Sequence, residues 1–300
     1  LSGCGSAYCQ KAVCKQVTQV SMLNAGLDSA IAIAERRNKK LGSSVYAGRS
    51  SSVIERAFLA LKSSTWFIVL SGFVEPVFYL LAFGYGIGNL IGVVTSPDGT
   101  EVPYAAFIAP ALLATSAMNG AIYDSTWNVF FKMHHAKLYQ GMLSTSLGPL
   151  DVALGEIGWA LLRGLTYALG FFAIVAPLGL ILSPWGILAI PAAVLIAFGF
   201  AAVGMGITSY LKNFQQLNWV NFVLLPMFMF SGTFYPLSVY PESVQFVVQL
   251  LPLWHAVELI RGLTLGALSV QMLGHVAYFV VMIALGLTFT TVRLRALFMK

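Results

Sequence analysis

Six long apolar stretches constrain this sequence more than any other feature. Each is about 20 residues or longer, and together they lie approximately at residues 66–91, 104–123, 152–176, 185–211, 217–235 and 270–292. A helix needs about 20 apolar residues to cross the hydrocarbon core of a bilayer. None of the stretches alternates apolar with polar residues, as the strands of a membrane barrel do. We therefore predict an all-α membrane protein with six transmembrane helices.

The scarcity of charge supports lipid as the solvent for most of the chain. Only 9% of the 300 residues are charged, whereas ordinary globular domains carry roughly 25%. So few charges cannot cover a water-exposed surface. This composition excludes most soluble enzymes, secreted disulfide scaffolds and disordered proteins.

The basic residues are distributed unevenly between the two sides of the predicted bundle. Of 17 Lys and Arg, 15 lie before the first stretch, between the second and third, between the fourth and fifth, or after the sixth. Cytoplasmic segments are enriched in Lys and Arg, so we predict that both termini are cytoplasmic. The net charge of +6 then reflects topology, and the expected partner is the lipid bilayer and not nucleic acid.

The polar N-terminal region divides into two parts. We expect residues 1–49 to form a cytoplasmic N-terminal extension that is partly disordered, and residues 50–65 to form an interfacial amphipathic helix. Within the second part, Val53, Ile54, Ala57, Phe58 and Leu61 recur at helical spacing. The alternative is a soluble helix in a small cytoplasmic domain. Residues 66–300 form the six-span transmembrane domain.

The connection between the fifth and sixth stretches contains two further apolar segments. Residues 243–251 and 256–268 are too short to cross a bilayer, and we predict an outer re-entrant helical hairpin, with an ordinary amphipathic loop as the alternative. His255, Glu258 and Arg261 recur there at every third residue. We predict a hydrogen-bonded clamp that holds the second short helix; a proton relay is the other interpretation.

Motifs of soluble enzymes are absent from the sequence. There is no G-x-x-x-x-G-K-[ST] phosphate loop, no H-E-x-x-H and no G-x-S-x-G. His134 and His135 are adjacent, which is poor geometry for ligands of one metal, and Cys4, Cys9 and Cys14 lack zinc spacing. We predict no catalytic residue, no metal site, and no cofactor bound by this chain.

Three residues that are charged at neutral pH lie inside the apolar stretches, where charge is expensive. They are Glu75 in the first stretch, and Glu156 and Arg163 in the third. They could form a polar route through the protein, or structural bridges between helices, with Glu75 and Arg163 as one possible pair. A proton-coupled secondary transporter using these three residues is an alternative function, although no inverted repeat is visible. A third alternative is an enzyme that acts on lipid-linked sugars, but the sequence contains no paired carboxylates that would support it.

Aromatic residues gather near the outer ends of the first two stretches. They can be explained as an interfacial aromatic belt. The more specific alternative is that they line a path for an amphipathic substrate. The residues that we assign to a candidate substrate pathway are Glu75, Tyr79, Phe83, Tyr104, Phe107 and Arg163.

Three strings in the same order resemble a known family. Residues 75–86 (EPVFYLLAFGYG), 230–237 (FSGTFYPL) and 251–262 (LPLWHAVELIRG) resemble the type-2 ABC exporter permeases, in the branch that includes nodulation-factor and daunorubicin-type exporters. The resemblance covers about Arg49 to the end of the chain.

The resemblance implies the transmembrane permease subunit of an ATP-driven exporter in the bacterial inner membrane. Its substrate would be lipidic, a glycolipid or oligosaccharide, or drug-like, and would leave the cytoplasm or inner leaflet by alternating access. ATP and Mg would be held by a separate ATP-binding cassette subunit beneath two permease copies, and symmetry favours a homodimer over a heterodimer. Residues 131–149 would supply the coupling segment, whose docking residues are Phe131, Lys132, Met133, Lys137, Leu138 and Tyr139.

Overall fold

The computed structural model describes residues 48–61, 67–96, 99–145 and 147–298. The predicted extension therefore lies outside the described residues, except for its last two positions.

The elements are, in chain order, α2 (Ser50–Leu61), α3 (Phe67–Tyr79), π-helical η1 (Leu80–Ile87), α4 (Gly88–Ile91), β1 (Val93–Thr95), β2 (Glu101–Pro103), α5 (Tyr104–Tyr123), π-helical η2 (Asp124–Asn128) and η3 (Phe131–His135), α6 (Leu138–Leu143), α7 (Pro149–Val175), 3-10 helical η4 (Pro184–Leu188), α8 (Ala189–Thr208), η5 (Phe214–Gln216), α9 (Leu217–Phe230), η6 (Leu237–Val239), α10 (Glu242–Gln249), α11 (Pro252–Leu265) and α12 (Gln271–Phe298).

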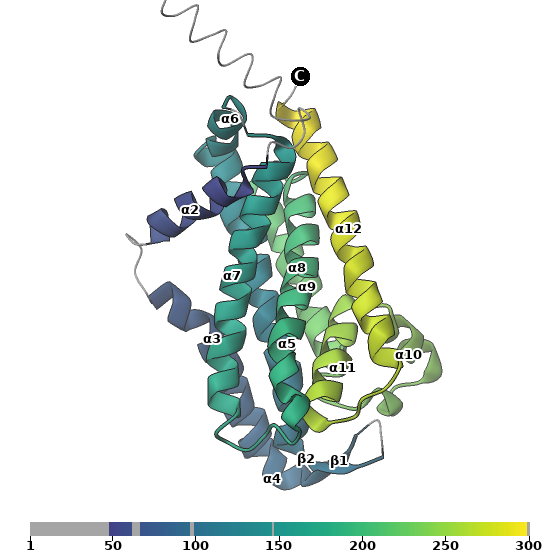
Figure 1. Cartoon of the computed structure of the whole chain (residues 1–300). Coiled ribbons are helices and arrows are strands. Elements are labelled where there is room, and N and C mark those ends of the chain that lie inside the picture. The colour runs from purple at the N-terminus through teal and green to yellow at the C-terminus, as the bar shows by residue number, and fades with distance from the viewer. Residues whose placement is uncertain (1–47, 62–66, 97–98, 146, 299–300) are drawn as a thin grey trace, which may run out of the picture.

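The chain is an elongated helical bundle (Figure 1). α6, α2 and the end of α12 lie at one end, while α4, α10 and the β1–β2 hairpin lie at the other. The two strands pair antiparallel, with Val94 opposite Val102. α5 forms the centre of the core, because nearly all of its residues are buried against α7, α8 and α11.

The described residues contain five helices that are long and apolar enough to cross a bilayer. They are Val74–Ile91, Tyr104–His135, Pro149–Val175, Pro184–Thr208 and Gln271–Leu297, and the number rises to six if α10 and α11, bent by 86°, count as one broken span. The all-α membrane class is therefore confirmed. The number of crossings depends on how the bent pair and α9 are counted.

The second span is longer than predicted. Its helix continues past Tyr123, where the predicted stretch ended, through η2 and η3 to His135. The Ser125 and Thr126 hydroxyls both donate to the carbonyl oxygen of Ile122. Their hydrogen-bonding groups are thus satisfied within the helix, and the buried Val129 and Phe130 continue its apolar face.

The fifth predicted span is shorter than expected. α9 ends at Phe230, and its 14 residues extend roughly 21 Å at 1.5 Å per residue, less than the ~30 Å hydrocarbon core. Gly232 adopts the left-handed conformation with φ 72°, which ends the helix, and the following turn is buried.

α10 and α11 occupy the region where two short apolar helices were predicted. The bend between them fits either a broken span or a re-entrant hairpin. Pro252 begins α11, a position that favours proline because its missing N–H would have no partner.

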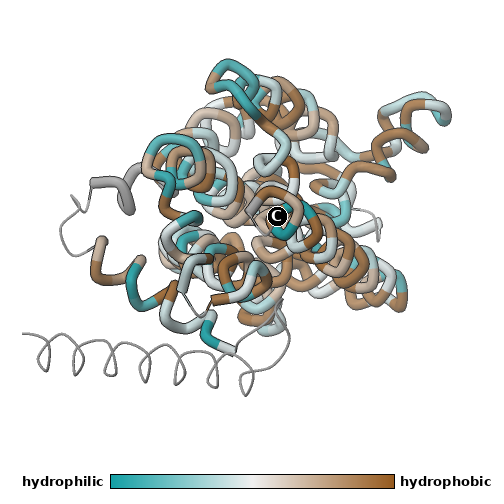
Figure 2. Tube along the Cα trace, turned by 90° about the horizontal axis from the view of Figure 1, so that it is seen from above, coloured by the Kyte–Doolittle hydropathy of each residue, from teal (hydrophilic) through white to brown (hydrophobic). Residues whose placement is uncertain are grey.

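Small residues let α8 and α12 approach closely. A Cβ at Gly286 of α12 would lie 2.7 Å from the backbone of Ala202, and one at Gly199 would lie 2.8 Å from the Phe279 ring. The Thr290 hydroxyl donates to the Ala202 carbonyl oxygen at 3.2 Å. Many of the remaining residues of α12 are apolar and exposed. Figure 2, which looks along the bundle, shows hydrophobic residues in brown along its helices.

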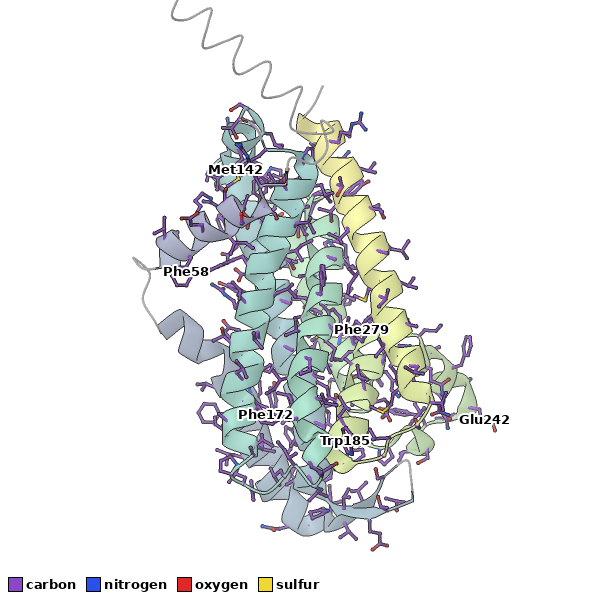
Figure 3. The ribbon with its side chains drawn as sticks, in the orientation of Figure 1. Phe58, Met142, Phe172, Trp185, Glu242 and Phe279 are labelled. Atoms are coloured by element: carbon purple, nitrogen blue, oxygen red, sulfur yellow. The ribbon has the colours of Figure 1, made fainter. Side chains whose placement is uncertain are left out.

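α2 crosses the side of α7 near the α6 end (Figure 1). Val53 is buried, and a Cβ at Gly155 of α7 would lie 2.4 Å from it, so the glycine permits the contact. The opposite face of α2 carries Phe58, which is 65% exposed (Figure 3). An amphipathic helix with an exposed aromatic residue remains compatible with the predicted interfacial position.

Candidate functional site

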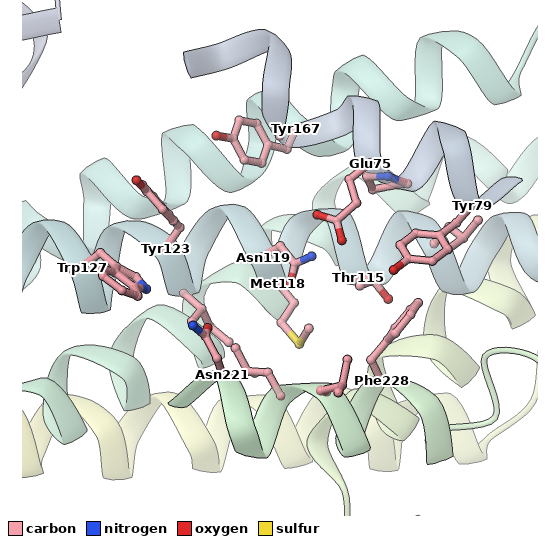
Figure 4. Close-up of a pocket in the computed structure, with 16 residues that line it drawn as sticks. Glu75, Tyr79, Thr115, Met118, Asn119, Tyr123, Trp127, Tyr167, Asn221 and Phe228 are labelled. Atoms are coloured by element: carbon pink, nitrogen blue, oxygen red, sulfur yellow. The ribbon is translucent and has the colours of Figure 1, made fainter. Parts of the chain in front are cut away.

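A cleft of about 610 Å³ opens between α3, α5, α7 and α9. Figure 4 shows its residues facing one another across the space. The polar and aromatic side chains that line it are Glu75, Tyr79, Thr115, Asn119, Tyr123, Trp127, Tyr167, Asn221 and Phe228. Aliphatic and Met side chains complete the lining, so the cleft is amphipathic.

Close packing of three helices defines one wall of the cleft. The Tyr167 ring of α7 lies against Gly72 of α3, where a Cβ would come within 1.9 Å of the ring. It also lies against Gly120 of α5, where the corresponding distance is 2.8 Å. Neither glycine has room for a side chain, so both positions allow α3 and α5 to converge on Tyr167.

Glu75 supplies the only carboxylate among the described residues that line the cleft. Its side chain is exposed, and no ion pair to it occurs in the described part of the chain. It points into the space that Thr115 and Asn119 border from α5 (Figure 4). The neighbouring Tyr79 packs on Phe228 of α9, with ring centroids 5.6 Å apart.

Four predicted pathway residues, Phe83, Tyr104, Phe107 and Arg163, lie outside the cleft lining. The Phe83 ring packs on Phe234 at 5.0 Å, and the Tyr104 hydroxyl donates to the carbonyl oxygen of Phe234 at 3.2 Å. Phe107 is fully buried, with the Arg261 guanidinium 3.9 Å from the centre of its ring. These aromatic side chains hold η1, α5 and the turn after α9 together.

Arg163 pairs with Asp124 and not with Glu75. Its Nε lies 2.8 Å from Asp124 Oδ2, the Asn128 amide donates to the other carboxylate oxygen, and Asp124 is buried. The guanidinium also lies 5.6 Å from the Tyr123 ring centre. Asp124 was not identified from the sequence as an ionisable residue within a span, because it lies one residue beyond the predicted end of the second span.

Buried Glu156 is the centre of a second ion-pair cluster. Lys132 Nζ donates to Glu156 Oε2 at 2.5 Å, and Arg56 Nη2 lies 3.4 Å from Oε1. The cluster joins α2, η3 and α7. Tyr139 of α6 is fully buried beside it, and burial, with a smaller contribution from the Glu156 charge, raises the pKa of its phenol well above the ordinary value.

The predicted coupling residues divide into exposed and buried groups. Phe131 is 43% exposed and Lys137 is also exposed, whereas Met133 and Tyr139 are buried and Lys132 is bound to Glu156. Leu138 is half-buried.

The exposed end of this segment is tied to the loop after α8. The His134 Nε2 donates to the Leu211 carbonyl oxygen at 2.9 Å, and the Phe131 ring lies 5.8 Å from the Phe214 ring. Lys137 directly precedes α6 and adopts the left-handed conformation, with φ 46°.

Two of the three predicted clamp residues interact directly. Arg261 Nη1 donates to Glu258 Oε1 at 2.6 Å, and Nη2 donates to the Gly232 carbonyl oxygen at 2.9 Å. Arg261 thus links α11 to the turn after α9. His255 points elsewhere, with its Nδ1 2.7 Å from Nδ1 of His275 on α12.

The cleft contains polar residues that the sequence analysis did not single out. Thr115, Asn119 and Asn221 meet there from α5 and α9. The signal that could have identified this site from the sequence is the presence of asparagines within otherwise apolar stretches. In the part of the chain that the structure describes, no group of three His, Cys, Asp or Glu side chains could hold a metal ion.

Comparisons with known proteins agree with the earlier resemblance. The family model described as ABC-2 type transporter matches residues 50–265. Nodulation protein J of Sinorhizobium fredii (strain NBRC 101917 / NGR234) is 32% identical over 211 residues, covering 70% of this chain and 79% of the relative. Nodulation protein J of Rhizobium leguminosarum bv. viciae is 30% identical over 252 residues, covering 83% and 95%. The Inner membrane transport permease YadH of Escherichia coli (strain K12) is 27% identical over 204 residues, covering 66% and 74%.

Proposed function

The chain belongs to the ABC-2 type transporter family, and from this premise we propose that it exports an amphipathic substrate through the cleft beside Glu75. As a member of that family it is the membrane subunit of an ABC transporter and not the ATPase. The proposed substrate class is a lipidic or glycolipid molecule, an oligosaccharide carried on lipid, or a hydrophobic drug. The substrate leaves the cytoplasm or the inner leaflet by alternating access.

The mixed lining of the cleft is the observation that carries this proposal. One carboxylate and the amides of Asn119 and Asn221 share the space with Tyr79 and Phe228. Ligand sites typically combine an apolar wall with a few placed polar groups, in volumes of about 300–1,000 Å³. Such a lining suits a molecule with a polar group and an apolar body.

An ATP-binding cassette subunit is the proposed source of energy, and it would hold ATP and Mg. We place its docking surface at the α6 end, where Phe131 and Lys137 are exposed. Lys132, Met133 and Tyr139 support this surface from below, because Met133 and Tyr139 are buried and Lys132 is paired with Glu156. A second permease copy completes the transporter, and we favour a homodimer.

The Glu156 cluster gives the docking end a mechanical connection to the bundle. Lys132 belongs to the segment that approaches the ATPase, Arg56 to α2, and Glu156 to α7. A displacement of the docking end therefore moves α2 and α7 as well. Since α7 also carries Tyr167, the movement reaches the wall of the cleft.

The distribution of basic residues supports a cytoplasmic position for the α6 end. Arg56, Lys132 and Lys137 lie toward this end, as do Arg293 and Arg295 at the end of α12, and the paired Arg261 lies toward the other (Figure 1). Positive charge is enriched on the cytoplasmic side of membrane proteins. Both termini are then cytoplasmic, in a multi-pass protein of the inner membrane.

Cysteine accessibility tests whether the cleft is the pathway. Asn119→Cys is made in a chain whose Cys4, Cys9 and Cys14 are replaced by Ser, and the assembled transporter is treated with a charged thiol reagent. We expect ATP and a transported substrate to change the labelling rate several-fold, because alternating access changes which side the cleft faces. Val280→Cys, on the exposed face of α12, is the control. Equal labelling in all states would contradict the proposal.

A further inference from the structure

Two further cavities adjoin each other at the end of the bundle opposite α6. A polar cavity of about 260 Å³ lies between the end of β1, α11 and the start of α12, and its polar lining residues are Ser96, Glu258, Arg261, Ser269, Gln271 and His275. An apolar groove of about 590 Å³ follows α12, past Tyr278 and Val281 to Leu285. Gln271 and His275 line both, so the two cavities meet at these residues.

Two residues that border the polar cavity carry buried hydrogen-bonding atoms without a partner in the described part of the chain. Ser96 is 3% exposed and Arg261 is 2% exposed, and both line the cavity. Ser96 Oγ and Arg261 Nε are buried and have no hydrogen-bond partner among the described residues. Such groups are rare in native interiors. A polar ligand group in the cavity would meet the other polar side chains that line it.

The charge in this cavity is already balanced. The Arg261 guanidinium is neutralised by Glu258, whose Oε1 lies 2.6 Å from Arg261 Nη1. The remaining polar side chains of the lining are hydroxyls, an amide and an imidazole. This mixture of donors and acceptors suits uncharged hydroxyl groups better than a phosphate or carboxylate, which would meet the Glu258 charge.

The groove has room for an extended hydrocarbon chain. A Cβ placed at Gly274 would meet no atom within 4 Å, and Ala277 also lines the groove. From Gln271 to Leu285 the helix rises roughly 21 Å at 1.5 Å per residue. This exceeds half of the ~30 Å hydrocarbon core, so the groove covers the depth of one leaflet.

We propose that this composite site binds a single lipid with an uncharged, hydroxyl-rich head group, such as a glycosyl lipid. The head group occupies the polar cavity and one acyl chain follows the groove along α12. His275, hydrogen-bonded to His255 at 2.7 Å, lies at the junction of head and chain. The site shares no lining residue with the cleft at Glu75, so the proposal does not depend on which substrate the cleft carries.

Native mass spectrometry of the purified full-length chain tests the proposal. The chain is placed in phosphatidylethanolamine nanodiscs with a small fraction of monoglucosyl diacylglycerol, diacylglycerol or phosphatidylglycerol, or with free glucose in solution. We expect the glucosyl lipid to be retained and each of the other three to bind at least about tenfold more weakly. Diacylglycerol lacks the head group, phosphatidylglycerol carries a charge, and free glucose lacks the acyl chain.

Two substitutions locate the binding. Gly274→Trp fills the groove and should weaken glucosyl-lipid binding more than about tenfold, because each methylene excluded from the groove costs about fourfold in affinity. Val280→Trp, on the same helix but outside the lining, is the matched control and should bind as the parent chain does. Gln271→Leu tests the polar cavity and should reduce the preference for the glucosyl lipid over diacylglycerol.

Three results would overturn the proposal. Binding that Gly274→Trp and Gln271→Leu leave unchanged would place the lipid elsewhere. Tighter binding of phosphatidylglycerol would show that the head-group chemistry is wrong, and retention of free glucose alone would make the cavity a site for a soluble sugar. Elution volume and thermal stability of each variant are measured first; if Gly274→Trp does not fold, Gln271→Leu decides the outcome.

Discussion

The buried Glu156 carboxylate lies 2.5 Å from the Lys132 ammonium, where η3 meets α7. The sequence places these residues 24 positions apart, in segments with different expected roles. Glu156 stood out as an ionisable residue inside a span, and Lys132 as a residue at the ATPase. The contact joins η3 directly to a membrane-spanning helix. In our proposal, a movement of the docking segment therefore acts on α7.

Glu156→Gln should uncouple ATP hydrolysis from transport. The substitution leaves Lys132 and Arg56 without their shared carboxylate, and a hydrogen bond to a charged group contributes about 1.5–3 kcal/mol. Since both cations are partly exposed, we expect a loss of stability toward the lower value. The assay compares ATPase activity with transport in the same vesicles. The account would be wrong if the two fell in proportion.

A double-mutant cycle shows whether the effect belongs to the pair. Lys132→Gln and Glu156→Gln are measured alone and together by denaturation of the purified chain. Residues in direct contact typically show interaction energies of about 0.5–3 kcal/mol. Strict additivity would show that the 2.5 Å contact does not contribute to stability.

The Asp124–Arg163 pair should stabilise the fold. Asp124→Asn alone leaves the Arg163 charge without its partner, and breaking a buried pair costs about 3–5 kcal/mol. The combined change Asp124→Leu with Arg163→Met removes both charges, and we expect it to recover most of the lost stability. Thermal unfolding measures all three chains.

Transport by the same double variant separates structure from pathway. Export that recovers together with stability assigns Arg163 to helix packing. If stability returns while export stays lost, Arg163 contributes to the substrate pathway, as the sequence analysis predicted.

Gly72→Ala should displace α3 from α7. The added Cβ would lie 1.9 Å from the Tyr167 ring, and overpacking of this kind costs about 1–3 kcal/mol. We expect lower thermal stability and impaired transport. Adding Tyr167→Leu should relieve the clash and restore stability, whereas Gly141→Ala, where a Cβ meets nothing within 4 Å, is the control. An unchanged melting temperature in Gly72→Ala would contradict this packing.

Glu75→Gln should impair export without destabilising the chain. The carboxylate is exposed in the cleft and has no ion pair in the described part of the chain, so its loss leaves no partner unsatisfied. We expect a rate about tenfold lower, corresponding to roughly 1.4 kcal/mol of lost interaction. Glu242→Gln in α10, away from the cleft, should transport normally. Reduced stability with normal export would make Glu75 a structural residue.

The sequence was sufficient to predict the membrane class and to identify the ionisable residues inside the spans. Because charged residues are scarce, each of them stands out. It did not place the end of the second span, since the hydroxyls of Ser125 and Thr126 are satisfied by the helix itself. It could not pair Arg163 with Asp124 either, because that choice depends on which helix faces meet. Nor could hydropathy show that Tyr104 and Phe107 lie outside the cleft, since aromatic residues suit a packed wall as well as a binding site.

Transport by reconstituted vesicles tests the central claim most directly. The purified permease is inserted with its ATP-binding subunit, and movement of a fluorescent short-chain glucosyl lipid is followed with and without ATP. The account predicts ATP-dependent movement that requires both subunits and falls about tenfold in Glu75→Gln. Movement driven by a proton gradient, in vesicles that hold the permease alone, would contradict it.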